Sequence, residues 1–255
     1  MCGIVAAIAD RNIVSVLLEG LRRLEYRGYD SAGLALLNAS GLQRLRAVGR
    51  VAELAARVEE TGAAGDVGIA HTRWATPGVP SERNAHPHVS GGLAVVHNGI
   101  IENHEALRGR LRAEGYVFTS ETDTEVVAHL VASELKKNPD FFAATRAAIA
   151  QLQGAYALAI VREADPGRIV VAREGSPLLL GLSGEGNYAA SDASALLQVT
   201  RRIVYLENGD CAELRRDGIR ITRVDGTPVE RAETESHLAA DAVELGPYRH
   251  YMQKE

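Results

Sequence analysis

The sequence predicts an α+β protein in which helices pack against antiparallel sheets. Strand-like runs come first along the chain, a block of three helical segments follows, and strand-like runs separated by turns fill the remainder. This order lacks the regular strand–helix–strand alternation of a doubly wound parallel sheet, so it favours a layered α+β architecture. With 255 residues, 46% of them apolar and 24% charged, the chain is long enough to bury a sizeable core in one large or two small domains.

The first part of the chain begins with a strand and an amphipathic helix. The apolar run at residues 2–9 is typical of a strand, and Asp10 and Asn12 are candidate caps for the helix that follows. Apolar residues at helical spacing predict that helix over residues 13–26, and a polar break with a glycine ends it at residues 27–31. Further strands are predicted at residues 32–37, 42–48, 67–72 and 93–97, with a short helix at residues 51–60.

The middle of the chain contains a long loop and three helices. Prolines and glycines interrupt residues 73–92, and a structureless segment of this length inside a compact domain is usually functional or disordered. Helices are predicted at residues 103–114, 122–137 and 140–151, and antiparallel strands at residues 155–162, 168–173, 177–182, 187–190, 202–206, 210–215 and 219–224. The tail from about residue 235 is polar and irregular.

The composition and the cysteine content exclude several classes of protein. The net charge of −5 argues against a nucleic-acid or anionic-membrane partner, and no apolar run reaches the roughly 18 residues of a transmembrane helix. The N-terminus lacks the basic segment of a signal peptide, so Cys2 and Cys211 are expected to be reduced thiols in the cytosol. Residues 184–189 fit a loose G-x-G-x-x-A pattern without a βαβ start, so we predict no cofactor there.

Cys2 is the first residue that could carry chemistry. Once Met1 is removed, its own α-amine lies within a few ångströms of the thiol and titrates near cytosolic pH. Such an amine can take the thiol proton, which activates the nucleophile without a separate histidine. A glycine at position 3 would let a substrate approach the backbone. The alternative is that Cys2 is a small apolar residue in a strand.

A second candidate is the sequence His97-Asn98-Gly99 at the end of a predicted strand. Asn-Gly is a common hairpin turn, and this is the simpler interpretation. The functional interpretation is an oxyanion hole made from the Asn98 side-chain amide and the Gly99 backbone N–H, since both are neutral donors suited to a tetrahedral intermediate.

The long loop holds further candidates. Arg73 carries a guanidinium fork that suits a carboxylate. His86 and His88 are either hydrogen-bonded loop histidines or an H-x-H metal pair with His71 or Asp123 as a further ligand. Because H-x-H without a third ligand at fixed spacing is a weak zinc signal, we expect no metal.

The acidic segment at residues 120–125 also has two interpretations. Thr122 or Ser120 caps the next helix, whose positive N-terminal end favours the neighbouring acids. In the functional interpretation, Asp123 binds the ammonium group of a substrate.

Taken together and in this order, these residues resemble the class II glutamine amidotransferases, which are N-terminal-nucleophile amide hydrolases. The shared marks are Cys-Gly-Ile after Met1 and a downstream His-Asn-Gly. Within that class the chain is most similar to the glutaminase domains of sugar-phosphate aminotransferases. The runs that carry this resemblance span nearly the whole chain: LEYRGYDSAGLA (24–35), HTRWAT (71–76), PSERNAHPH (80–88), HNGIIENH (97–104), SETDTEV (120–126) and YRHYMQKE (248–255).

The resemblance implies a four-layer αββα sandwich of two antiparallel sheets and a glutaminase site. It assigns Cys2 as nucleophile and base, with Asn98 and Gly99 as the oxyanion hole. The substrate L-glutamine would be held at its α-carboxylate by Arg73 and at its α-ammonium by Asp123, a pairing that suits a zwitterion. The remaining assignments that it implies are Thr76 and His86 in the binding loop, Trp74 at the gate of an ammonia passage, and Arg27 near the site.

The resemblance also implies partners beyond this chain. Residues 2–235 would be the glutaminase domain, and residues 236–255 the start of a linker to a sugar-isomerase half that binds fructose 6-phosphate as ammonia acceptor. We therefore expect an excised or truncated domain, with a homodimer only through the missing half. One departure is Pro77, which stands where relatives often have histidine; a proline stiffens the loop and removes a donor.

Two other functions stay open at this point. A non-catalytic regulatory or binding module would keep the fold without the chemistry, and retained Met1 would favour it because a blocked amine is not a base. A metal hydrolase built on His71, His86 and His88 is the second.

Overall fold

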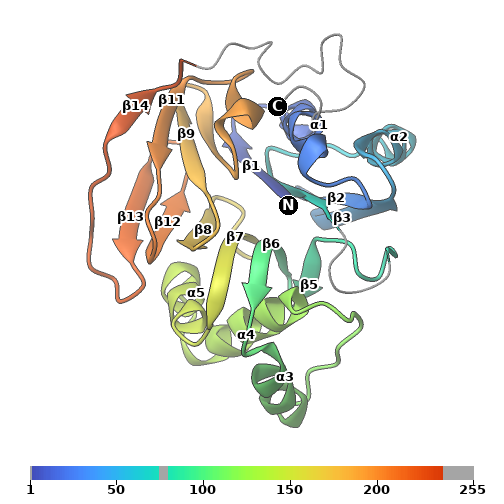
Figure 1. Cartoon of the computed structure of the whole chain (residues 1–255), viewed down its shortest axis with the longest axis vertical. Helices are drawn as coiled ribbons and strands as arrows, with labels where there is room; N and C mark the ends of the chain where they lie inside the picture. The colour runs from blue at the N-terminus through green and yellow to red at the C-terminus, as the bar shows by residue number, and fades with distance from the viewer. Residues whose placement is uncertain (1, 75–79, 238–255) are drawn as a thin grey trace.

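The computed structural model describes residues 2–74 and 80–237, which form two antiparallel sheets (Figure 1). The strand order is β14-β11-β9-β10-β1-β4-β2-β3 in the first sheet and β13-β12-β8-β7-β6-β5 in the second. The strands of the first sheet are β1 (Gly3–Ala9), β2 (Ser31–Asn38), β3 (Gly41–Val48), β4 (Val67–Arg73), β9 (Leu179–Ser183), β10 (Gly186–Ala190), β11 (Arg202–Tyr205) and β14 (Glu233–Glu235). Those of the second are β5 (His88–Ser90), β6 (Leu93–Ile101), β7 (Gly154–Arg162), β8 (Ile169–Glu174), β12 (Asp210–Leu214) and β13 (Ile219–Arg223).

Helices cover the outer face of each sheet. They are α1 (Val14–Leu24), α2 (Val51–Thr61), α3 (His104–Ala113), α4 (Thr124–Lys137) and α5 (Phe141–Ile149), with 3₁₀ turns η1 (Glu25–Arg27) and η2 (Ala193–Leu196). In Figure 1, α1 and α2 lie beside β1 to β3, whereas α3 to α5 gather beside β6 and β7. Three apolar clusters result, one between the sheets and one under each helical layer. This arrangement confirms the αββα sandwich and the α+β class.

Strand β1 shows why the chain begins with an unbroken apolar run. Val5 and Ala7 face the helices, while Ile4 and Ala6 face the second sheet, so both faces of the strand are buried. A strand covered on both faces needs apolar residues at consecutive positions rather than at alternate ones. Because β1 lies in the middle of its sheet, between β10 and β4, it holds the residue before it, Cys2, at one end of the sandwich.

Several predicted boundaries were wrong by a few residues. The first helix ends at Leu24 and continues as a single 3₁₀ turn, and α4 begins at Thr124 instead of residue 122. Asn12 accepts a hydrogen bond from the Val14 N–H at 3.2 Å, whereas Asp10 pairs with Arg216 instead of capping the helix. The short strands β5 and β14 were not predicted, because a three-residue strand has too few positions to show a period.

The helices of the described residues include none that is long and apolar enough to cross a membrane.

Candidate active site

Cys2 lies half-buried at the entrance to β1, with its sulfur in a cavity. Its Sγ accepts a hydrogen bond from the Trp74 backbone N–H at 3.4 Å, and its carbonyl oxygen accepts one from Asn98 Nδ2 at 3.1 Å. Burial raises the pKa of the Cys2 thiol, and the Trp74 N–H offsets only part of this effect. The thiol is therefore protonated at rest, and an attack by sulfur needs a base.

Gly3 is required by close packing. A Cβ at this position would lie 2.8 Å from Leu24 Cβ and 2.8 Å from Thr72 Oγ1. The close neighbours are thus helix α1 and strand β4. Because Gly3 lets β1 pack closely against α1 and β4, the core of the protein fixes the position of Cys2.

Asn98 and Gly99 lie inside strand β6, so the hairpin-turn interpretation was wrong. The ladder between β6 and β7 continues through this point, with Asn98 opposite Ala157 and Gly99 opposite Tyr156. Gly99 has a φ of +125°, and a Cβ there would lie 2.0 Å from the Ala155 carbonyl oxygen, so only glycine fits. The strand leaves Gly99 exposed beside the buried Asn98, which places both next to Cys2 in the same cavity wall.

Arg73 ends strand β4 in a buried position. Its Nη1 lies 3.7 Å from Asp30 Oδ2, and burial raises the pKa of that carboxyl. Asp30 was not among the predicted site residues; it holds the guanidinium beside the cavity that Cys2 and Arg73 line together. A buried arginine next to the nucleophile suits a carboxylate ligand.

Asp123 precedes α4, yet its carboxylate does not cap the helix. Oδ2 instead accepts a hydrogen bond from the Ile101 N–H at 2.8 Å and lies 3.9 Å from His97 Nδ1. Ser120 donates to Glu125 and Thr122 contacts His88, so neither hydroxyl caps α4 as one interpretation had it. Asp123 is thus fixed by the strand that carries Asn98 and Gly99, and it lines the cavity of Cys2 and Arg73.

A second hollow of about 350 Å³ also has Cys2 in its lining. It shares Cys2, Trp74 and Gly99 with the first cavity. Its remaining lining residues are Arg27, Asn98, Ile100, Ser176 and Pro177. Trp74 is 44% exposed and meets Tyr29 edge-on with ring centroids 5.5 Å apart. Cys2 and Trp74 therefore border both hollows, of which the second has the less polar lining.

Arg27 lies in η1 at the edge of this second hollow. Its Nη2 donates to Asp192 Oδ2 at 2.5 Å, an ion pair between segments 165 residues apart. Arg27 thereby ties the loop before β2 to the loop after β10.

The histidines of the long loop contact one another, and they do not converge on one point. His86 Nδ1 lies 3.0 Å from His71 Nδ1, and His86 Nε2 lies 2.9 Å from Thr124 Oγ1. His88 Nε2 contacts the Thr122 hydroxyl. In the part of the chain that the structure describes, no group of three or more ligand residues could hold a metal ion. Thr76 and Pro77 lie outside the described residues.

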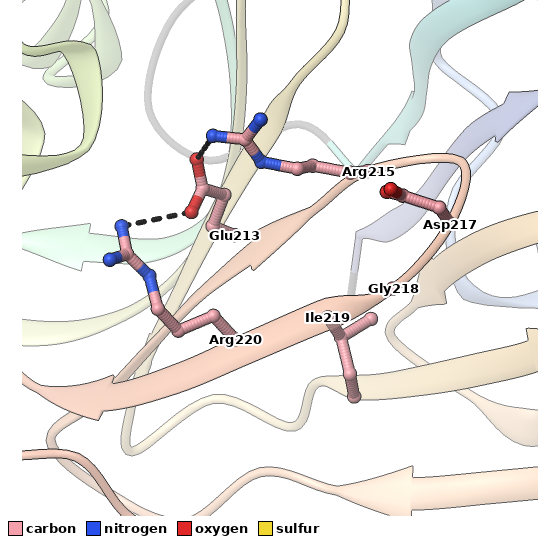
Figure 2. Close-up of a pocket in the computed structure, with 6 residues that line it drawn as sticks. All are labelled: Glu213, Arg215, Asp217, Gly218, Ile219 and Arg220. Atoms are coloured by element: carbon pink, nitrogen blue, oxygen red, sulfur yellow. Dashed lines mark hydrogen bonds and ion pairs between the residues drawn. The ribbon is translucent and has the colours of Figure 1, made fainter.

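A further surface hollow lies over the β12–β13 hairpin, and none of its lining residues lines the Cys2 cavities. Figure 2 shows Glu213 at its centre, paired with Arg215 and Arg220 at 2.9 Å each. These guanidinium groups neutralise a buried carboxylate, and the lining of this hollow has no thiol or histidine.

Comparisons with known proteins agree with this site. The family model of the glutamine amidotransferase domain matches residues 71–198. The chain is 59% identical to the glutamine–fructose-6-phosphate aminotransferase (isomerizing) of Acidithiobacillus ferridurans, and 56% identical to those of Pseudomonas putida and Vibrio cholerae. Each match covers 100% of this chain, which spans 42% of the length of these curated relatives.

Solved structures show the same architecture. Glutamine phosphoribosylpyrophosphate amidotransferase from B. subtilis is 26% identical, with a TM-score of 0.74 over 88% of this chain and 49% of the other. A glutamine aminotransferase class-II domain protein from Silicibacter pomeroyi is 19% identical, with a TM-score of 0.60 over 87% of this chain and 99% of the other, and it supports the fold alone.

Proposed function

Because the chain belongs to the glutamine amidotransferase domain family, we propose that it hydrolyses L-glutamine to glutamate and ammonia. The observation that carries the proposal is the single cavity lined by Cys2, Arg73, Gly99 and Asp123. It brings a nucleophile, a cation, a backbone donor and an anion together around a space of about 30 Å³, which shares Cys2 with the second hollow.

The substrate is held at its α-carbon end and reacts at its side-chain amide. Arg73 binds the α-carboxylate and Asp123 the α-ammonium, so the amide carbon falls next to the Cys2 sulfur. In the first step the α-amine of mature Cys2 takes the thiol proton while the sulfur bonds to the amide carbon. The resulting oxyanion receives hydrogen bonds from Asn98 Nδ2 and the Gly99 N–H.

The intermediate then collapses with loss of ammonia. The carbon–nitrogen bond breaks, the protonated amine of Cys2 gives its proton to the departing nitrogen, and a γ-glutamyl thioester remains. A water molecule, deprotonated by the same amine, adds to the thioester carbon. The carbon–sulfur bond breaks, the sulfur recovers a proton, and glutamate leaves.

We further propose that the ammonia is used in a longer protein. The curated relatives that match are named as glutamine–fructose-6-phosphate aminotransferases, so fructose 6-phosphate is the proposed acceptor and a sugar-isomerase half the proposed partner. Residues 2–235 would be the glutaminase domain, with residues 236–255 leading toward that half. The second hollow, lined by Trp74 and Arg27, is the proposed exit for ammonia. Thr76 and His86 are proposed to shape the glutamine-binding loop, and the free thiols of Cys2 and Cys211 suit a cytosolic enzyme.

The test compares two cysteine variants. Cys2→Ala should abolish glutamate release and the intact-mass adduct formed with a glutamine-like diazoketone. Cys211→Ala is the matched control, because Cys211 is fully buried and its pKa is raised to about 12, so it should react like the unchanged chain. Intact mass also reports whether Met1 is removed. Equal glutamate release by Cys2→Ala and the unchanged chain would refute the mechanism, and retained Met1 without activity would favour a non-catalytic module.

A further inference from the structure

A chain of buried hydrogen-bonded side chains lies behind the oxyanion donors. It joins His97, Thr124, His86, His71 and Asn98, all at most 7% exposed. The proposed mechanism uses only the last member. The residues come from four places in the chain, namely β4, the loop after it, β6 and α4.

The orientation of the Asn98 amide fixes the first link. Nδ2 lies 3.1 Å from the Cys2 carbonyl oxygen, which can only accept a hydrogen bond. The other end of the amide, Oδ1, therefore faces His71, whose Nε2 lies 3.0 Å away. The same Nε2 lies 3.0 Å from the His97 carbonyl oxygen. Two acceptors at one ring nitrogen require that this nitrogen carries the proton.

The remaining protons follow from that one. His86 Nδ1 lies 3.0 Å from His71 Nδ1 and 3.1 Å from His71 Nε2. Because Nε2 carries the proton, Nδ1 is the acceptor, and His86 donates to it from its own Nδ1. His86 Nε2 is then an acceptor, and the Thr124 hydroxyl donates to it at 2.9 Å. The Thr124 oxygen also lies 2.9 Å from His97 Nδ1. Every donor from Thr124 onward thus points toward Asn98.

The rings stay neutral, as this assignment requires. Burial lowers the pKa of His71 to about 3 and lowers the pKa of His86 and His97 as well. Near neutral pH each ring carries one proton, so only one nitrogen of each ring can donate a hydrogen bond.

We propose that His71 is a positioning residue of glutamine hydrolysis, which holds the Asn98 amide so that its nitrogen and not its oxygen faces the reacting carbonyl. This role rests on the proposed function. The amide nitrogen has two hydrogens; one bonds the Cys2 carbonyl, and the second is the donor assigned to the oxyanion. An amide rotated by half a turn would present an oxygen lone pair to a developing negative charge. Aligned donors also polarise one another, so the chain strengthens the last N–H.

The activity test uses a disruptive and a conservative variant. His71→Leu removes the donor, whereas His71→Gln keeps an N–H at about the reach of Nε2. Loss of a whole oxyanion donor costs about 10²–10³ in kcat, and the Gly99 N–H remains, so His71→Leu should lower kcat by roughly 10–100-fold with little change in the KM for glutamine. His71→Gln should recover most of that loss. A folded His71→Leu with unchanged kcat, an effect on KM alone, or two equally slow variants would overturn the role.

A second measurement needs no turnover and no variant that folds poorly. Nitrogen NMR of the unchanged chain with ¹⁵N-labelled histidine reads the tautomer of each ring directly. We expect His71 protonated on Nε2 alone, and His86 on Nδ1 alone. A proton on Nδ1 of His71, or a charged ring, would overturn the inference even if glutamine is hydrolysed. Failure of the proposed function has a different signature, because the unchanged chain would then release no glutamate and form no adduct at Cys2.

Discussion

Lowering the pH from 7.5 to 5 is expected to destabilise this fold through the buried histidines next to Asn98. Burial penalises the charged ring and lowers the pKa of His71 from 6.5 to about 3. Between these values the unfolded chain binds a proton that the folded chain does not. The stabilisation is therefore complete above pH 6.5 and is lost progressively as the pH falls toward 3.

The magnitude follows from the shift. At pH 5 a ring with an unfolded pKa of 6.5 and a folded pKa well below 5 loses about 2 kcal/mol of stability. Burial also lowers the pKa of His86 well below its usual value, so this ring adds to the loss in the same direction. The choice of pH 5 separates this effect from the carboxylates: the pKa of buried Glu125 is lowered from 4.5, so its stabilisation is lost only at more acidic pH.

Equilibrium unfolding in urea at the two pH values measures the difference. His71→Gln removes one titrating ring, so its loss between pH 7.5 and 5 should be about 2 kcal/mol smaller than that of the unchanged chain. His104→Gln, at a histidine that lies partly exposed at the start of α3, is the matched control and should keep the full loss. Equal stability of the unchanged chain at both pH values, or an undiminished loss in His71→Gln, would refute the reasoning.

Three further outcomes follow from the site and the fold. Asp123→Asn removes the charge proposed to bind the substrate ammonium, so it should raise the KM for glutamine about 10–100-fold. Glu105→Gln, at an exposed position, is the control and should leave the KM unchanged. Steady-state glutamate release measures both, and an unchanged KM in Asp123→Asn would contradict the ammonium role. Gly33→Ala places a Cβ 2.1 Å from the His86 carbonyl oxygen and should lower the free energy of unfolding in urea by about 1–3 kcal/mol or more. Gly109→Ala has open space around it in α3 and should raise that free energy by up to about 1 kcal/mol. Equal effects of the two variants would contradict the packing argument. Dialysis against EDTA should leave glutamate release unchanged, because the His86 nitrogens are hydrogen-bonded to His71 and Thr124. A loss of activity that zinc restores would contradict the absence of a metal role for these histidines.

Much of the fold could be predicted from local patterns. The unbroken apolar run of β1 and the helical spacing of apolar residues in α1 involve residues close together in the chain. In any compact protein such patterns indicate which faces of a strand or helix are buried. Cys2, Arg73 and Asp123 could also be identified as candidates, because a thiol, a guanidinium and a carboxylate each suit only a few chemical roles. The His97-Asn98-Gly99 segment was ambiguous by itself, since Asn-Gly serves both turns and bulged strands.

Only the tertiary structure decided how these groups work together. Pairing with β7 made Asn98 and Gly99 part of a strand, and contact with Cys2, 96 residues away, set the direction of the Asn98 amide. The partners of Arg73 and His71, namely Asp30 and Asn98, lie 43 and 27 residues away and carry no local signal. Hydrogen bonds depend on distance and direction in space, whereas a sequence pattern reports only which residues share a face of one helix or strand. The sequence by itself therefore determined the layers and the candidate site residues, and the packing of the two sheets determined which donor faces which acceptor.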